Sequence, residues 1–266
     1  MTGRTPTLAI STGPMWRLSL EESFAAVAAS GADGVEVLVT QSEDTRTVST
    51  LERLAQRHSL PIVAIHAPQL LLTRRVYSTD QVEKVRRTHD LCRALDVSTL
   101  VVHPPYLWQV RYSLWVLHEL EEAFAGEHTL VAMENMYPIH VGNRRMRFHR
   151  FGDVGSLRRF HHVTLDTSHL GVAEHDIVDA YRQLRDRVVH VHLSDNRGKG
   201  RDSHAPLGHG VLPIAEFVQG LTGTALRSVC LEIDPGPPTD DPNKIEQRLG
   251  ESLDIVRRHL PNPVDR

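Results

Sequence analysis

Short runs of apolar and β-branched residues recur along the chain. Eight of them are candidate strands, at residues 7–11, 34–39, 61–66, 99–104, 129–135, 162–169, 188–195 and 228–234. Longer amphipathic segments follow or separate them, for example residues 18–31, 78–97 and 242–260. In the first of these segments, Ser19 is suited to cap the helix and Gly31 to close it.

This alternation of strands and helices is typical of a parallel sheet. Eight such units in 266 residues predict an α/β fold, a closed (β/α)8 TIM barrel that occupies residues 1–266 as a single domain. No G-x-G-x-x-G sequence follows the first strand, which argues against a dinucleotide-binding fold. The irregular residues 136–156 are expected to form a long loop.

Polar residues recur where the predicted strands end. They are His66, His103, Glu134, Asp166, His169, His192 and Glu232. The carboxyl ends of barrel strands meet at one mouth, where active sites are built. One such histidine alone can be a hydrogen-bonded structural residue. Several acids and imidazoles on one face instead favour a bound divalent cation, such as Zn²⁺, Mn²⁺, Mg²⁺ or Co²⁺.

Seven motifs in order resemble the xylose isomerase-like barrels. They are IHAP (65–68), VVHP (101–104), MEN (133–135), LDTSH (165–169), HVHLSD (190–195), RDSHAPLGHG (201–210) and LEI (231–233). That superfamily includes sugar-phosphate isomerases and epimerases, inosose dehydratases and nucleases of the endonuclease IV type. The resemblance implies a metal site formed by Glu134, Asp166, His192 and Glu232.

The same resemblance implies an enzyme that isomerises or epimerises a small sugar or a similar hydroxy-carbonyl compound. The cation would stabilise an enediolate while Glu134 and Glu232 transfer the proton. His169 would be a further catalytic or ligating residue. One metal ion per chain is expected for this chemistry.

A nuclease-like alternative is also open. The additional zinc ligands of the endonuclease IV type match His66, His103, His169, Asp202 and His204, which would allow up to three ions and phosphodiester cleavage in abasic DNA. A third alternative is a barrel that binds a sugar or a metal without catalysis.

Two departures from these patterns are visible. Gln69 stands where the nucleases have a tyrosine, and the loops that enter DNA are not evident. Ketose 3-epimerases carry a glutamate and an arginine where this chain has His140 and Gly198.

Other residues are candidates for substrate contact. Trp108 could form an aromatic surface for a sugar, and Lys199 and Arg201 could approach an anionic substrate. Arginines are frequent in residues 142–160, where they either bind phosphate or form a solvated face. We expect Gly208 and Gly210 to permit a tight turn.

Composition limits the choice of partners. A net charge of −3 argues against nucleic acid as the main partner and leaves a small sugar-like molecule as the expected one. No apolar run is long enough to span a membrane, and residues 1–10 do not resemble a signal peptide. We therefore expect a cytoplasmic protein with no membrane partner, able to form a homo-oligomer.

Overall fold

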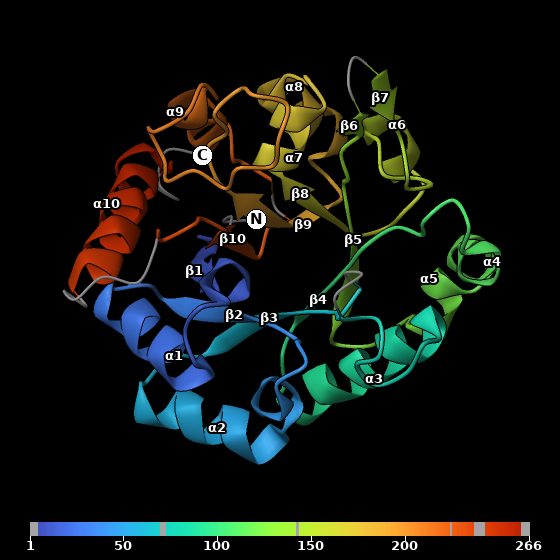
Figure 1. The fold of residues 1–266 in the computed structure, drawn as a ribbon, viewed down its shortest axis with the longest axis horizontal. Coiled ribbons are helices and arrows are strands. Elements are labelled where there is room, and N and C mark those ends of the chain that lie inside the picture. Colours follow the sequence, from blue (N-terminus) through green and yellow to red (C-terminus); the bar gives the residue numbers. More distant parts are fainter. Residues whose placement is uncertain (1–4, 70–72, 142–143, 224, 237–242, 262–266) are drawn as a thin grey trace.

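The computed structural model describes residues 5–69, 73–141, 144–223, 225–236 and 243–261. Eight parallel strands form a closed barrel, which confirms the predicted fold (Figure 1). They are β1 (Thr7–Ser11), β2 (Gly34–Leu38), β3 (Ile62–His66), β4 (Thr99–Val102), β5 (Leu130–Glu134), β8 (Val163–Asp166), β9 (Val188–Leu193) and β10 (Ser228–Leu231). The barrel closes where β1 pairs with β10.

Helices surround the barrel (Figure 1). They are α1 (Leu20–Ala29), α2 (Val48–Arg57), α3 (Gln81–Ala94), α4 (Val110–His118), α5 (Leu120–Ala123), α6 (Val154–Leu157), α7 (Thr167–Val172), α8 (Ile177–Leu184), α9 (Ile214–Gln219) and α10 (Asn243–His259). Two short 3-10 helices, Gly13–Met15 and Glu43–Arg46, follow β1 and β2. Among the described residues, no helix has the length and apolar character needed to cross a bilayer.

The ends of α1 follow directly from the local sequence. Ser19 accepts a hydrogen bond from the backbone N–H of Glu22, and the Glu22 side chain accepts one from the backbone of Ser19. This reciprocal capping box satisfies donors that the first helical turn leaves free. Gly31, two residues past the helix, has a φ of +78°, which glycine adopts without strain. Both predicted ends of this helix are confirmed.

Apolar side chains join the helices to the outside of the barrel in one buried cluster. Phe24 of α1, Leu54 of α2 and Leu253 of α10 belong to it and have at most 1% of their surface exposed. Burial of each such side chain stabilises the fold by about 1.5–3 kcal/mol. The cluster therefore gives the strand ends a rigid frame.

The expectation of an irregular loop over residues 136–156 is wrong in part. Strands β6 (Ile139–Val141) and β7 (Arg144–Met146) form an antiparallel hairpin there, and α6 follows. Each strand has only three residues, and β7 is exposed throughout. Three residues are too few to show an alternating pattern, and β7 has no buried face that would impose one, so periodicity could not reveal the hairpin.

Candidate metal centre

Histidines and carboxylates gather at the carboxyl ends of the barrel strands. Nine of the candidate residues form three neighbouring groups whose possible ligand atoms lie within 4.8 Å of one another. The groups are His66, His103 and Glu134; Glu134, Asp166, His192 and Glu232; and His169, Asp202 and His204. The structure thus brings together all nine residues, and Glu134 belongs to two groups.

Glu134, at the end of β5, lies between the first two groups and is 1% exposed. Its Oε2 lies 3.3 Å from Nε2 of His66 and 3.0 Å from Nε2 of His103. Its Oε1 lies 3.0 Å from Nδ1 of His192 and 3.6 Å from Nδ1 of His169. Oε2 thus faces the first group and Oε1 faces the second, so this carboxylate could provide a ligand to a cation in either group.

The second group surrounds Nδ1 of His192, on β9. Oε2 of Glu232 lies 3.0 Å from that nitrogen, and Oδ2 of Asp166 lies 3.9 Å from it. Asp166 Oδ2 is buried and has no hydrogen-bond partner among the described residues. An unpartnered carboxylate oxygen is costly to bury, so the donor set fits a cation at this position.

The third group lies on the loop after β9 and at the start of α7. Asp202 Oδ2 lies 2.8 Å from Nε2 of His204 and 3.4 Å from Nε2 of His169. Ser168 donates a 2.6 Å hydrogen bond to the other oxygen of Asp202. His204 is held further by its Nδ1, 2.9 Å from the carbonyl of Glu232.

A buried carboxylate, Asp195, shapes this loop. It accepts hydrogen bonds from the backbone N–H groups of Asn196, Gly208, Gly210 and Leu212. A Cβ at Gly210 would lie 2.2 Å from Asp195 Oδ1, so glycine is required there for close approach. Gly208 has a φ of +81°, which agrees with the predicted tight turn. Asp195 thereby fixes the segment that carries Asp202 and His204.

Comparisons with known proteins agree with this arrangement. Residues 24–259 match the family model described as "Xylose isomerase-like TIM barrel". The chain belongs to the xylose isomerase-like TIM barrel family. An uncharacterised protein of Mycobacterium tuberculosis is 31% identical, with 94% of this chain and 96% of that protein covered.

Two further similar proteins are named after activities that differ from each other. A Mycobacterium bovis protein described as "Probable endonuclease 4" is 24% identical, with 88% of this chain and 97% of that protein covered. A solved structure described as a D-tagatose 3-epimerase-like protein is 21% identical, with a TM-score of 0.70 and coverage of 95% of this chain and 98% of that chain. The second likeness shows the fold alone.

Glu36 is a buried residue of this xylose isomerase-like barrel that our sequence reasoning missed. Its Oε2 lies 2.9 Å from Nε2 of His192 and 3.0 Å from Nε2 of His190. Nδ1 of His190 in turn lies 2.7 Å from Ser228 Oγ. His192 directs its Nε2 to Glu36 and its Nδ1 to the carboxylates of the second group, so Nδ1 is the atom that would ligate a cation once it has lost its proton. An acid within the apolar run GVEVLV was the available signal.

The protonation of these groups reflects their mutual proximity. Burial disfavours charged His192, but Glu36, Glu232 and Glu134 raise its pKa well above the usual value. Burial likewise opposes ionisation of Glu134, yet His192 and His103 hold its pKa well below the usual value. Burial raises the pKa of Asp166 to about 7. Protons on the imidazoles therefore balance the carboxylate charge when no cation does so.

The cavity at the barrel mouth has a volume of about 350 Å³. Seven of the nine candidate ligands line it, all except Asp166 and His192, and its wall also includes Trp16, Met136 and Tyr137. Trp16, on the segment after β1, is 75% exposed, and Tyr137 lies against His169 with 4.6 Å between ring centroids. Neither residue was among our predictions, since no pattern distinguishes a rim aromatic residue from any other exposed one.

The three residues expected to contact substrate lie outside this cavity wall. Trp108 stacks on Tyr106, with 4.6 Å between centroids. Lys199 and Arg201 are exposed on a segment that turns at Gly198 and Gly200, both of which have a positive φ. Substrate contact by Trp108, Lys199 and Arg201 stays a prediction.

Gln69 has a structural position here. It is 4% exposed, its Nε2 donates a 2.7 Å hydrogen bond to the hydroxyl of Tyr112, and its Oε1 accepts one from the backbone N–H of His103. Gln69 stands where the nucleases have a tyrosine. Its side chain is held inside the protein by Tyr112 and by the backbone of His103, the residue that follows β4.

Removal of metal ions with a chelator should leave a chain whose stability falls as the pH rises from about 6.5 to 10. His66, His169, His192 and His204 have a raised pKa, about 10 for His204, because burial is outweighed by neighbouring carboxylates. A histidine whose pKa is higher in the folded state contributes fully to stability below its pKa in the unfolded state, near 6.5. That contribution is lost as the pH rises through its pKa in the folded state.

Thermal melting in EDTA between pH 6 and pH 10 tests this expectation. Metal-loaded protein should lose less stability over the same range, since bound cations require deprotonated imidazoles. A melting temperature that rises with pH in the chelated protein would contradict it.

Glu36→Gln should weaken zinc binding by about ten- to a hundredfold, because a neutral amide no longer orients and polarises His192 as a carboxylate does. Chelator competition measures the affinity. Ser228→Ala is the matched control, since it removes the bond to His190 and leaves the contact between Glu36 and His192. Wild-type zinc affinity in folded Glu36→Gln protein would show that Glu36 has no such role.

Proposed function

We propose that this chain is a metal-dependent enzyme that hydrolyses a phosphoester, with three divalent cations bound at the barrel mouth. The observation that carries the proposal is the division of the Glu134 oxygens between two ligand groups, with a third group adjoining. A single-ion centre formed by Glu134, Asp166, His192 and Glu232 does not use the flanking groups as ligands. Those groups are His66 and His103 on one side and Asp202 and His204 on the other.

The donor set suits this role. The groups hold three, four and three residues, with imidazole and carboxylate as the only donors. Neutral imidazoles and carboxylates suit Zn²⁺ and Mn²⁺, and sites with few protein ligands keep positions open for substrate. Such ions, when bound, neutralise phosphoryl oxygens and lower the pKa of water.

The protein's own residues supply the remaining parts of the reaction. Glu232 and Asp202 line the cavity and can accept the proton of the attacking water. Trp16, Met136 and Tyr137 limit the access of other water molecules. Burial keeps the ligands in fixed positions, since His192 and Asp166 have no exposed surface.

A small molecule is favoured over nucleic acid as the substrate. The volume of about 350 Å³ suits a small ligand. Among the described residues that line this cavity there is no lysine or arginine. Polynucleotide binding depends on such contacts with phosphates. The proposed substrate is therefore a small phosphoester, such as a phosphorylated sugar.

Isomerisation or epimerisation of a sugar is the second candidate. The observation that favours it is that Glu134 and Glu232 each place an oxygen 3.0 Å from Nδ1 of His192. Two carboxylates beside one cation could transfer a proton between two carbons through an enediolate. This chemistry needs Glu134, Asp166, His192 and Glu232, with His169 as a further catalytic or ligating residue. It assigns no metal-binding role to His66, His103, Asp202 and His204.

Substitution of His66 separates the two candidates. His66→Gln should lower the rate of 4-nitrophenyl phosphate hydrolysis by at least about a hundredfold, because loss of a ligand should exceed the loss of a residue that only orients one. His128→Gln, a change at an exposed histidine outside the cavity, is the control. The rate is followed by release of nitrophenolate.

Two results would count against hydrolysis. One is no phosphoesterase activity in the metal-loaded wild-type protein. The other is a ketose-epimerising activity that persists in His66→Gln and disappears in Glu232→Gln.

A further inference from the structure

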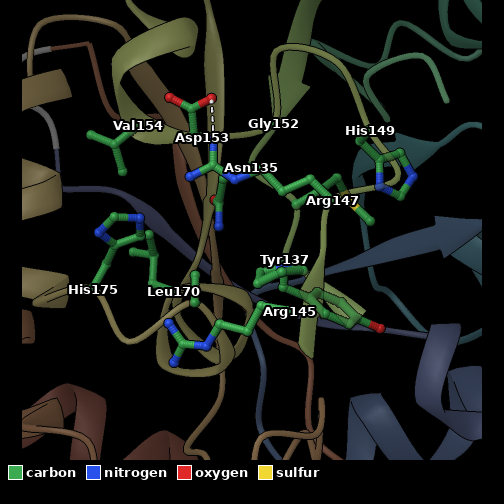
Figure 2. Close-up of a pocket in the computed structure, with 13 residues that line it drawn as sticks. Asn135, Tyr137, Arg145, Arg147, His149, Gly152, Asp153, Val154, Leu170 and His175 are labelled. Carbon is green, nitrogen blue, oxygen red and sulfur yellow. Dashed lines mark ion pairs between the residues drawn. The ribbon is translucent and has the colours of Figure 1, made fainter. Parts of the chain in front are cut away.

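A second cavity, of about 250 Å³, adjoins the metal centre (Figure 2). The segment after β5, the β6–β7 hairpin with the segment that follows it, and α7 provide its walls. Met136 and Tyr137 line both cavities and separate them. A ligand at the metal centre could therefore extend past Tyr137 into this side cavity.

Cationic side chains line the side cavity. Arg145 and Arg147 reach it from the hairpin side, and Figure 2 shows them drawn around the same space as His175. Arg145 forms an ion pair with Glu174, and Arg147 lies 3.7 Å from Asp153. Exposed ion pairs of this kind contribute little, so both guanidinium groups can turn to another anion.

Asp153 competes only weakly with such an anion for Arg147. Its Oδ1 accepts a hydrogen bond from the Ser156 N–H and its Oδ2 accepts one from the Ser156 hydroxyl, which cap α6. The carboxylate therefore already has partners on its own segment. Arg147, at 3.7 Å, lies beyond hydrogen-bond distance from it.

His149 provides an independent observation. It lines the same cavity, and its ring packs against Tyr106 with 4.2 Å between centroids. Both of its ring nitrogens are buried and have no hydrogen-bond partner among the described residues. A neutral imidazole always carries one N–H donor, so this donor lacks an acceptor among the described residues.

Three other arginines of this region already have hydrogen-bond partners. Arg150 donates to the carbonyl of Leu107, and Arg158 donates to Gln183. Arg159 donates to the carbonyl of Ser156. Arg145 and Arg147 are the arginines of this region that line the cavity, and Arg144 does not line it.

We propose that the side cavity binds a phosphate group through Arg145, Arg147 and His149. Guanidinium groups match phosphate oxygens with paired hydrogen bonds. The further step, that this phosphate belongs to the substrate and lies away from the bond that is cleaved, rests on the proposed function. The substrate would then be a small molecule with two anionic groups.

Calorimetric titration of the full-length, metal-loaded protein with inorganic phosphate tests the proposal. Any phosphate bound at the metal centre is common to all variants and cancels in the comparison. Arg147→Gln should weaken one binding event about tenfold, through loss of charged hydrogen bonds. Glu174→Gln should strengthen the same event, because it releases Arg145. Arg150→Gln is the matched control and should leave it unchanged.

The proposal is overturned if Arg147→Gln and Glu174→Gln both bind phosphate as Arg150→Gln does. It is also overturned if acetate, and not phosphate, gives the Arg147-dependent event. Phosphate binding that depends on Arg147 in a protein without phosphoesterase activity would support the side cavity while contradicting the proposed hydrolysis.

Discussion

The contact of the Glu134 carboxylate with four imidazoles is the interaction on which the rest of the site depends. His66, His103, His169 and His192 approach its two oxygens from different strands and from α7, in a region almost without exposed surface. Charge at such a place must be balanced locally, because water is excluded. Either protons on the imidazoles or bound cations can provide that balance. The stability of the protein therefore depends on whether the cations needed for the proposed reaction are bound.

The barrel makes this contact possible. Parallel strands end at one mouth, so residues far apart in sequence meet there with their backbone positions fixed by the surrounding core. Beneath the mouth, Glu36 continues the network through His192 and His190 to Ser228. Above it, Asp195 holds the loop that carries Asp202 and His204. The ligand groups are thus supported from both sides.

The sequence pattern was sufficient for the barrel and for seven candidate ligands at the strand ends, whereas Asp202 and His204 were implied by the resemblance to the endonuclease IV type. Buried parallel strands give continuous apolar runs, and a polar residue such as His66 or Glu134 is conspicuous at the end of one. Glu36 carried the same signal within a strand, and we did not use it. The hairpin β6–β7 was missed because its strands have only three residues each and β7 is exposed throughout.

The surroundings of the site depend on tertiary structure and could not be inferred in this way. Trp108 and Trp16 are both exposed tryptophans, yet only Trp16 lines the metal cavity. Likewise, Arg145 and Arg150 belong to one arginine-rich segment, and only the folded hairpin shows which of them faces the side cavity. Long-range packing decides which way the side chain of a loop residue points, and local sequence patterns do not encode such packing.

The most direct test of the central claim is a count of metal ions per chain. Protein purified without chelators and dialysed against metal-free buffer would be analysed by inductively coupled plasma mass spectrometry. We predict about three divalent ions per chain in the wild type and a lower count in His204→Gln. One ion per chain, unchanged by that substitution, would contradict a three-ion centre and favour the single-ion isomerase.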